Sequence, residues 1–188
     1  DVCSSDLGWV EVVYEGQGIP FVLEAGDCVI QPPRIRHRVL RCSDEMHVVE
    51  VGYPAEHVTR SDPHTPLPSA SLPSDHEWDG QRFIRFSSAA ADWSLTRPGQ
   101  SVADTGIATA TKGLADVRVV ALDESEYDID TVPERSFRMI FVLSGRAEAQ
   151  LGDRVLDLED SSTMVVPCGS ATRVHGSGRF LDISIATR

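Results

Sequence analysis

His37 is the residue whose type and setting most directly suggest chemistry. It ends the stretch GDCVIQPPRIRH, in which Gly26, five residues, a proline, four residues and the histidine follow in order. Neutral imidazole is a good ligand for first-row transition metals. The glycine-aspartate pair predicts a tight turn, residues 28–31 a short strand, and the two prolines a bend before a second strand. The spacing therefore places one metal-type ligand on a strand that follows two turns.

This spacing resembles the second conserved motif of the cupins, small β-barrels that often hold one metal ion near the barrel axis. The resemblance implies that His37 corresponds to the metal-ligating histidine of that motif. The sequence departs from the family pattern at Arg34, where the family usually has glycine, and at Arg41, where it often has asparagine. Neither change removes the ligand, so the resemblance implies a cupin fold in which His37 points into the barrel.

The other ligands that the resemblance implies have no counterpart at the expected place. A cupin supplies two histidines and a glutamate from an earlier motif that ends in a glycine, which Gly8 fits. Only DVCSSDL precedes Gly8, and it contains neither histidine nor glutamate. Because this heptapeptide resembles the translation of a common sequencing-library adapter, we interpret residues 1–7 as an assembly scar. The first barrel is then expected to be incomplete, and the alternative is an ordinary polar N-terminus.

Composition limits the class of partner. The chain of 188 residues is 41% hydrophobic, as expected for a protein that buries a core, and its formal net charge is −12. This charge argues against nucleic acid as a partner, because nucleic-acid binders usually present a basic face. No apolar run approaches the roughly 20 residues that a membrane helix needs. The four cysteines lack metal-site spacing. We expect no nucleic-acid or membrane partner and a cytoplasmic location.

The strand pattern occurs twice along the chain. The first block has alternating, β-branched segments, and residues 59–79 are rich in proline and polar residues, as is typical of an extended linker. In the second block TMVVPCGSATRV aligns with CVIQPPRIRHRV when Pro167 is placed on Pro32. We therefore predict an all-β fold of two cupin-type jelly-roll barrels, a bicupin. The predicted parts are residues 8–60 for the partial first barrel, 61–80 for the linker and 81–188 for a degenerate second barrel.

The second barrel has the wrong residues for a metal. Thr172 stands at the place equivalent to His37, Ser161 replaces the leading glycine, and Arg138 occupies the glutamate position counted back from Gly145. An arginine would repel a cation, so we predict a barrel without metal. His175 lies near the motif, but on a strand of period two it should point to the opposite face.

The remaining candidates have simpler structural explanations. Glu45 and His47 alternate on a strand but follow a polar turn, which predicts exposure. We expect two linker histidines to be solvated, three aromatic residues of the first block to pack in the core, and two glycines to shape turns. These residues are His64 and His76; Trp9, Tyr14 and Phe21; and Gly106 and Gly113.

Three functions remain open, because one fold hosts many activities. The resemblance implies a parent that is a metal-dependent oxygenase or isomerase acting on a small organic substrate, with a divalent transition metal at His37. The present fragment is then expected to hold no metal and to be inactive. The alternatives are a non-catalytic module that binds a small ligand, and a structural role with a homodimer formed through the second barrel.

Overall fold

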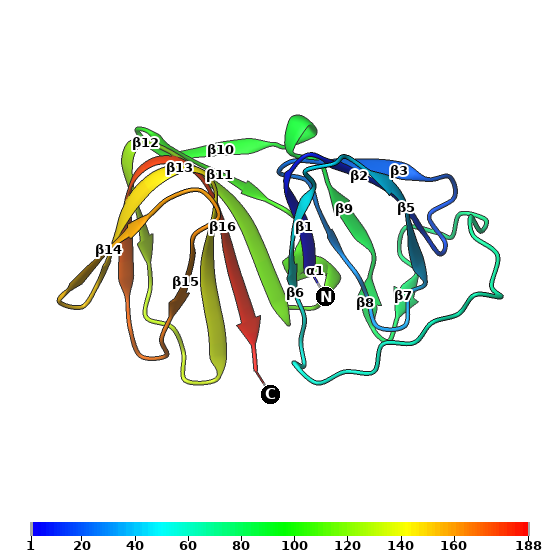
Figure 1. Ribbon diagram of the computed structural model, residues 1–188. Coiled ribbons are helices and arrows are strands. Elements are labelled where there is room, and N and C mark those ends of the chain that lie inside the picture. The colour runs from blue at the N-terminus through cyan, green and yellow to red at the C-terminus, as the bar shows by residue number, and fades with distance from the viewer. Residues whose placement is uncertain (1, 188) are drawn as a thin grey trace. The chain divides into compact units, whose positions relative to one another are not determined.

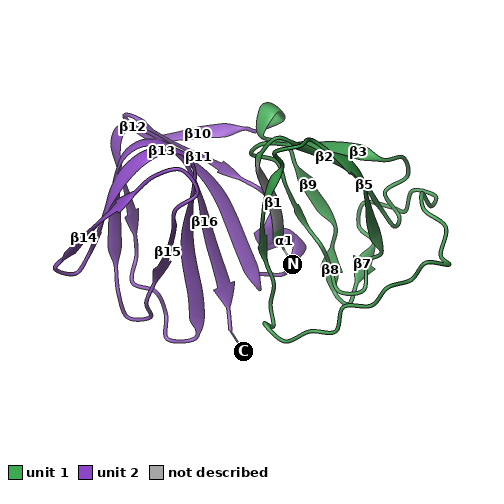
Figure 2. Ribbon diagram, viewed as in Figure 1, with its two compact units in different colours: residues 1–90 green, residues 91–188 purple. Residues whose placement is uncertain are grey.

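The computed structural model describes residues 2–187, and their regular secondary structure is almost entirely β-strand (Figure 1). The chain forms two compact units, residues 1–90 and 91–188 (Figure 2). The predominance of strands confirms the predicted all-β class. The boundary between the units follows Ala90, so the strand at 84–86 belongs to the first unit, beyond the predicted boundary near residue 80. None of the described helices is long and apolar enough to cross a membrane.

Unit 1 contains two main sheets and a short hairpin. The strand orders are β6-β1-β4-β9 and β3-β2-β5, and β7 pairs with β8. Residues 2–7, which we interpreted as a scar, form β1, whereas residue 1 lies outside the described residues. The strands are β1 (Val2–Leu7), β2 (Trp9–Tyr14), β3 (Phe21–Glu24), β4 (Cys28–Ile30), β5 (His37–Cys42), β6 (His47–Val51), β7 (Glu77–Trp78), β8 (Gln81–Arg82) and β9 (Ile84–Phe86).

Alternation along β2 creates the core of unit 1. Val10, Val12 and Tyr14 share one face of the strand and are buried, because successive side chains of a strand point to opposite faces. Leu23 of β3, with Val29 and Ile35, packs against this face, and the cluster includes partly buried Phe21, Met46, Trp78 and Phe83 at its edge. The predicted core role of Tyr14 and Phe21 is thus confirmed.

The proline-rich segment predicted as a linker folds back on unit 1. The Gly16 N–H donates to Ser69 Oγ at 2.7 Å, and the Leu72 N–H donates to the Gly16 carbonyl at 2.8 Å. Arg36 Nε also donates to Asp62 Oδ2 at 2.9 Å. Hydrogen bonds from Thr65, followed by one from the His64 N–H, lower the pKa of Asp62 to about 2. The segment is therefore held against the first strands of unit 1 by several hydrogen bonds, although most of its residues are exposed.

Unit 2 is a sheet of long strands with one helical turn. The strand order is β10-β11-β12-β16-β13-β14, and β15 pairs with β13. The segment between β11 and β12 holds the helical turn, whose buried Ile107 and Ala110 face the strands. The elements are β10 (Trp93–Arg97), β11 (Gln100–Asp104), α1 (Ile107–Ala110), β12 (Ala115–Ile129), β13 (Ser136–Leu151), β14 (Arg154–Leu158), β15 (Thr163–Val166) and β16 (Thr172–Ala186).

The long strands of unit 2 bend where glycines allow two backbones to touch. Gly145 of β13 pairs with Gly178 of β16 and has a φ of 102°. A Cβ at Gly145 would lie 2.2 Å from the Ser177 carbonyl oxygen and 2.6 Å from the Gly178 Cα. Both neighbours are backbone atoms and cannot rotate away. Because the ladder of β13 with β16 shifts register between Val142 and Ser144, this glycine contact lies at the bend.

The two units share backbone turns at positions that align in sequence. With Pro167 placed on Pro32, Gly26 (φ 89°) aligns with Ser161 (φ 64°). Arg34 (φ 65°) likewise aligns with Gly169 (φ 76°). A non-glycine residue rarely adopts a positive φ, so the coincidence at both positions supports the internal repeat.

We predict that Gly145→Ala strongly destabilises the fold because the added Cβ meets fixed backbone. The expected loss in the free energy of unfolding is about 3 kcal/mol, from a left-handed backbone and an overpacked contact. Gly152→Ala is the matched control, since Gly152 also has a positive φ (59°) but open space around its Cβ position. Chemical denaturation should show a much smaller loss for the control. Equal losses would mean that the close approach has no energetic role.

Candidate functional site

His37 lies on the inner face of unit 1. It pairs in register with Tyr14, and the two rings stack with centroids 5.2 Å apart and an interplanar angle of 19°. Directly opposed residues of an antiparallel pair share one face of the sheet. Because Tyr14 is buried in the core, His37 stands on the core side of the sheet, although its own side chain is exposed.

An aromatic cluster surrounds the Tyr14 ring. Phe83 lies 4.8 Å from it and Phe21 lies 5.9 Å away, measured between ring centroids. The Gln31 amide Nε2 donates to Tyr14 Oη at 2.8 Å, which satisfies the polar end of the buried ring. His37 thus lies against one side of an aromatic cluster that is centred on the Tyr14 ring.

The residues present do not fit a bound transition metal. Among the side chains that the structure describes, residue 2 and residues 7–187, no three His, Cys, Asp or Glu gather as a group that could hold a metal ion. Glu45 and His47 are exposed, as are His64 and His76. Tight binding of a first-row metal needs several converging ligands. The role of His37 as a metal ligand therefore stays a prediction, and we derive no chemical step through a metal.

Arg138, which we predicted to keep cations out of unit 2, belongs to a buried polar triad. Arg138 donates through Nε and Nη2 to the two carboxylate oxygens of Asp182, at 2.9 and 2.6 Å. Tyr127 Oη donates to Asp182 Oδ2 at 2.5 Å. The Asp182 side chain is 3% exposed and that of Arg138 is 21% exposed. The charge of Arg138, which we predicted to repel a cation, is therefore neutralised by the carboxylate of Asp182. We call Tyr127, Arg138 and Asp182 the unit 2 triad.

Burial and the neighbouring carboxylate act on the pKa values of two triad residues, Tyr127 and Arg138. Desolvation first, and then the charge of Asp182, raises the pKa of Tyr127 well above its ordinary value. Burial alone would lower the pKa of Arg138, but the hydrogen bond and charge of Asp182 outweigh this and raise it. Tyr127 therefore remains a neutral donor and Arg138 remains charged over the ordinary pH range.

Thr172 lies on the buried face of β16, and its hydroxyl has no hydrogen-bond partner in the described structure. His175 is exposed, as predicted for the opposite face. Gly106 and Gly113 have φ values of 78° and 81°, as expected of residues that shape turns. None of these residues joins a candidate catalytic group.

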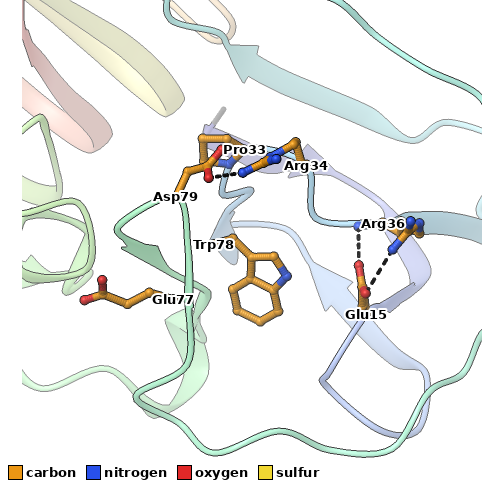
Figure 3. Close-up of a pocket in the computed structure, with 7 residues that line it drawn as sticks. All are labelled: Glu15, Pro33, Arg34, Arg36, Glu77, Trp78 and Asp79. Atoms are coloured by element: carbon orange, nitrogen blue, oxygen red, sulfur yellow. Dashed lines mark hydrogen bonds and ion pairs between the residues drawn. The ribbon is translucent and has the colours of Figure 1, made fainter.

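A surface pocket of about 400 Å³ opens on unit 1 beside the β4–β5 turn (Figure 3). Trp78 lies in the middle of the view and charged side chains lie around it. Trp78 also packs against the core cluster of unit 1, and its ring meets His76 edge-on with centroids 4.5 Å apart. The pocket is lined by Glu15, Pro33, Arg34, Arg36, Glu77, Trp78 and Asp79. We call it the Trp78 pocket.

Both arginines of the Trp78 pocket are paired with carboxylates. Arg34 forms an ion pair with Asp79, and Arg36 Nη1 lies 3.1 Å from Glu15 Oε1. Arg36 also binds Asp62. The pocket therefore offers both donors and acceptors around one apolar ring, and its lining is more charged than that of most small-molecule sites.

Sequence reasoning missed this pocket, although two local signals could have found it. Asp79 and Gly80 join β7 to β8 with φ values of 49° and 80°, the conformation of a tight hairpin turn that the dipeptide Asp-Gly favours. Arg34 stands where glycine is expected and still adopts a φ of 65°. The first signal places Trp78 on an ordered hairpin. The second places a charged side chain at a strained backbone position.

We predict that breaking the unit 2 triad destabilises the protein. Asp182→Asn leaves the Arg138 charge half-buried without its partner and should cost about 3 kcal/mol of unfolding free energy. Tyr127→Phe removes one hydrogen bond and should cost about 1 kcal/mol. Asp128→Asn is the control, because Asp128 pairs with Arg173 and Arg97 at the surface and should matter far less. Equal denaturation midpoints for the two Asp→Asn variants would contradict this account.

Comparison with known proteins identifies the fold but no close relative. No protein-family model and no curated protein matches the chain. The Escherichia coli protein YlbA matches over 98% of this chain and 66% of its own, with 11% identity and a TM-score of 0.60. KdgF from Halomonas sp. matches 55% of this chain and 94% of its own, with 18% identity and a TM-score of 0.46.

A third similar structure is an RmlC-like cupin from Shewanella frigidimarina. It covers 55% of this chain and 90% of its own, with 11% identity and a TM-score of 0.43. Identities this low concern the fold alone. The described strands show an all-β fold, and the match to YlbA shows that this fold is similar to the one that YlbA adopts.

Proposed function

We propose that this chain binds a small organic molecule in the Trp78 pocket. The observation that carries the proposal is the pocket itself, about 400 Å³ in volume, with one indole among paired guanidinium and carboxylate groups. Small-molecule sites are largely pre-formed and combine apolar walls with a few fixed polar groups. Here the ion pairs hold the polar groups in place before any ligand arrives.

The surroundings of the pocket support a pre-formed site. Trp78 lies on a two-strand hairpin closed by the Asp79-Gly80 turn, and Arg36 bridges β5 to the segment at Asp62. Leu72 and Ser69 bind the backbone of Gly16, next to Glu15. Ordering the pocket walls in advance lowers the entropy that binding must overcome.

A metal-dependent oxygenase or isomerase acting on a small organic substrate is the second candidate. One observation favours it: His37 lies on the inner face beside Tyr14, as the cupin motif predicts. The described residues do not supply the further ligands that such a site needs. This function, the divalent metal, a homodimer and a cytoplasmic location all stay predictions.

The binding proposal is tested by the indole N–H resonance of Trp78. The chain has three tryptophans, so this resonance is assigned by its loss in Trp78→Phe. Panels of neutral sugars, carboxylates, phosphates, amines and planar heterocycles are added at millimolar concentration. We expect at least one class to shift the Trp78 resonance in a saturable manner while the spectrum of the core is unchanged. If no class does so, the pocket is not a binding site.

The control for this measurement is Trp9→Phe. Trp9 also lies in unit 1 and contacts an arginine, with Arg41 5.6 Å from its ring centroid, but it does not line the pocket. The variant should keep the ligand response of Trp78. A saturable shift confined to the Trp9 resonance would move the site elsewhere and contradict the proposal.

We predict that the chain binds no transition metal stoichiometrically, because His37 is one ligand without converging partners. The protein is purified without chelator, dialysed against Zn²⁺, Mn²⁺ or Ni²⁺, desalted, and analysed for metal content. The expected content is well below one ion per chain and is unchanged in His37→Ala. A content of one ion that falls in His37→Ala would show that further ligands exist, with Glu45, His47 and His175 the first to test.

A further inference from the structure

We infer that the ligand of the Trp78 pocket is an uncharged ring molecule that carries several hydroxyl groups, such as a pyranose sugar or a cyclitol. The inference rests on the proposed binding function and adds the chemical class of the ligand. Three features of the pocket support it: the pairing of its charges, the position of its polar groups around Trp78, and the conformation of Arg34.

The charges of the pocket leave little demand for a charged ligand. Arg34 is paired with Asp79, and Arg36 with both Glu15 and Asp62. An anionic ligand would have to compete with these carboxylates for the guanidinium groups. A cation would in turn compete with the guanidinium groups for the carboxylates. A hydroxyl group can donate to a carboxylate and accept from a guanidinium without separating the pair.

The polar groups lie on several sides of the indole. Figure 3 shows Arg34 and Asp79 together on one side of Trp78, Arg36 and Glu15 on another, and Glu77 apart from both. A ring with hydroxyl groups around its whole perimeter can reach each of these groups. Its C–H face can rest on the indole, which offers a large apolar surface.

A planar aromatic ligand fits the same walls less well. Trp78 is the one aromatic side chain among the residues that line the pocket, and Pro33 supplies the remaining apolar surface. A heterocycle would therefore stack on one face only, and its few edge groups would leave most of the donors and acceptors without a partner. Polar groups covered without a partner weaken binding.

Arg34 stands at a turn position whose positive φ glycine would satisfy without strain. It has a φ of 65°, and its aligned position in unit 2 is Gly169 with a φ of 76°. Glycine adopts this conformation without strain, whereas arginine does not. The Arg34 side chain is 80% exposed, so burial does not explain the residue. Strained residues cluster at functional sites, and here the strained residue presents a guanidinium to the pocket.

The test compares ligands that share one ring and differ in charge. Glucose and myo-inositol are the neutral probes, glucuronate is the anion, protonated glucosamine is the cation, and adenine is the planar heterocycle. Each is titrated against the Trp78 indole resonance at pH 6. We expect saturable binding of a neutral probe in the millimolar range, typical of a ligand of this size, and at least fivefold weaker binding of both charged sugars and of adenine.

Two variants separate binding from folding. Trp78→Ala should abolish the response of the backbone amides of residues 34–36 to the neutral probe. Arg34→Gly removes the guanidinium and relieves the backbone strain, so its melting temperature should rise while its affinity falls at least threefold. A stable Arg34→Gly variant with unchanged affinity would show that Arg34 does not contact the ligand. That result would overturn the inference.

The outcomes distinguish a failure of the inferred ligand class from a failure of the proposed binding function. If glucuronate, glucosamine or adenine binds more tightly than both neutral probes, the pocket still binds a small molecule and the inferred class is wrong. If no probe of any class shifts the Trp78 resonance, both the inference and the proposed function fail. Binding of the neutral probes that persists in Trp78→Ala would place them at another site and also overturn the inference.

Discussion

The left-handed turn after the β4 strand is the constraint on which the candidate site depends. Proline bends the chain, and the backbone at residue 34 must take a positive φ before β5 can return to pair with β2. Glycine would satisfy this turn without strain, as Gly169 does in unit 2. With arginine there, the same turn also directs a guanidinium group toward Asp79. One backbone requirement thus fixes both the return of His37 to the inner face and one wall of the pocket.

Unit 2 keeps the turn but uses its inner polar groups differently. Arg138, at the glutamate position of the repeat, is held by both oxygens of Asp182, and Tyr127 donates to the same carboxylate. Tyr127 pairs in register with Val174, whereas Asp182 pairs with Arg118, so the triad joins distant parts of β12 and β16. A buried ion pair of this kind is weak evidence for net stability. It does favour one arrangement of the folded sheet, because any arrangement that separates Arg138 from Asp182 would leave a buried charge without its partner.

Much of the fold could be predicted from the sequence, because period-two patterning and turn residues act locally. The turn at Gly26, the strand that begins at His37 and the alignment of Pro167 with Pro32 all follow from short segments. The triad could not be predicted in full, since Asp182 lies on an apolar strand and its partners come from two other strands. The Trp78 pocket was missed for a related reason. Its walls come from Glu15 just after β2, the β4–β5 turn and a segment whose composition indicated only an extended linker.

The segment after β6 shows what composition alone does not reveal about a proline-rich stretch. Prolines exclude inner strands and long helices, but they do not prevent a chain from docking through its remaining N–H groups and side chains. Asp62 and Ser69 supply acceptors, Leu72 supplies a backbone donor, and Asp79-Gly80 supplies a tight turn. Each contact is modest, and the partners lie far apart in sequence. Their joint effect is to bring Trp78 to the core of unit 1 at the place where Arg34 is held. The function that we propose therefore depends on this docked segment as much as on the β-strands of unit 1 beside it.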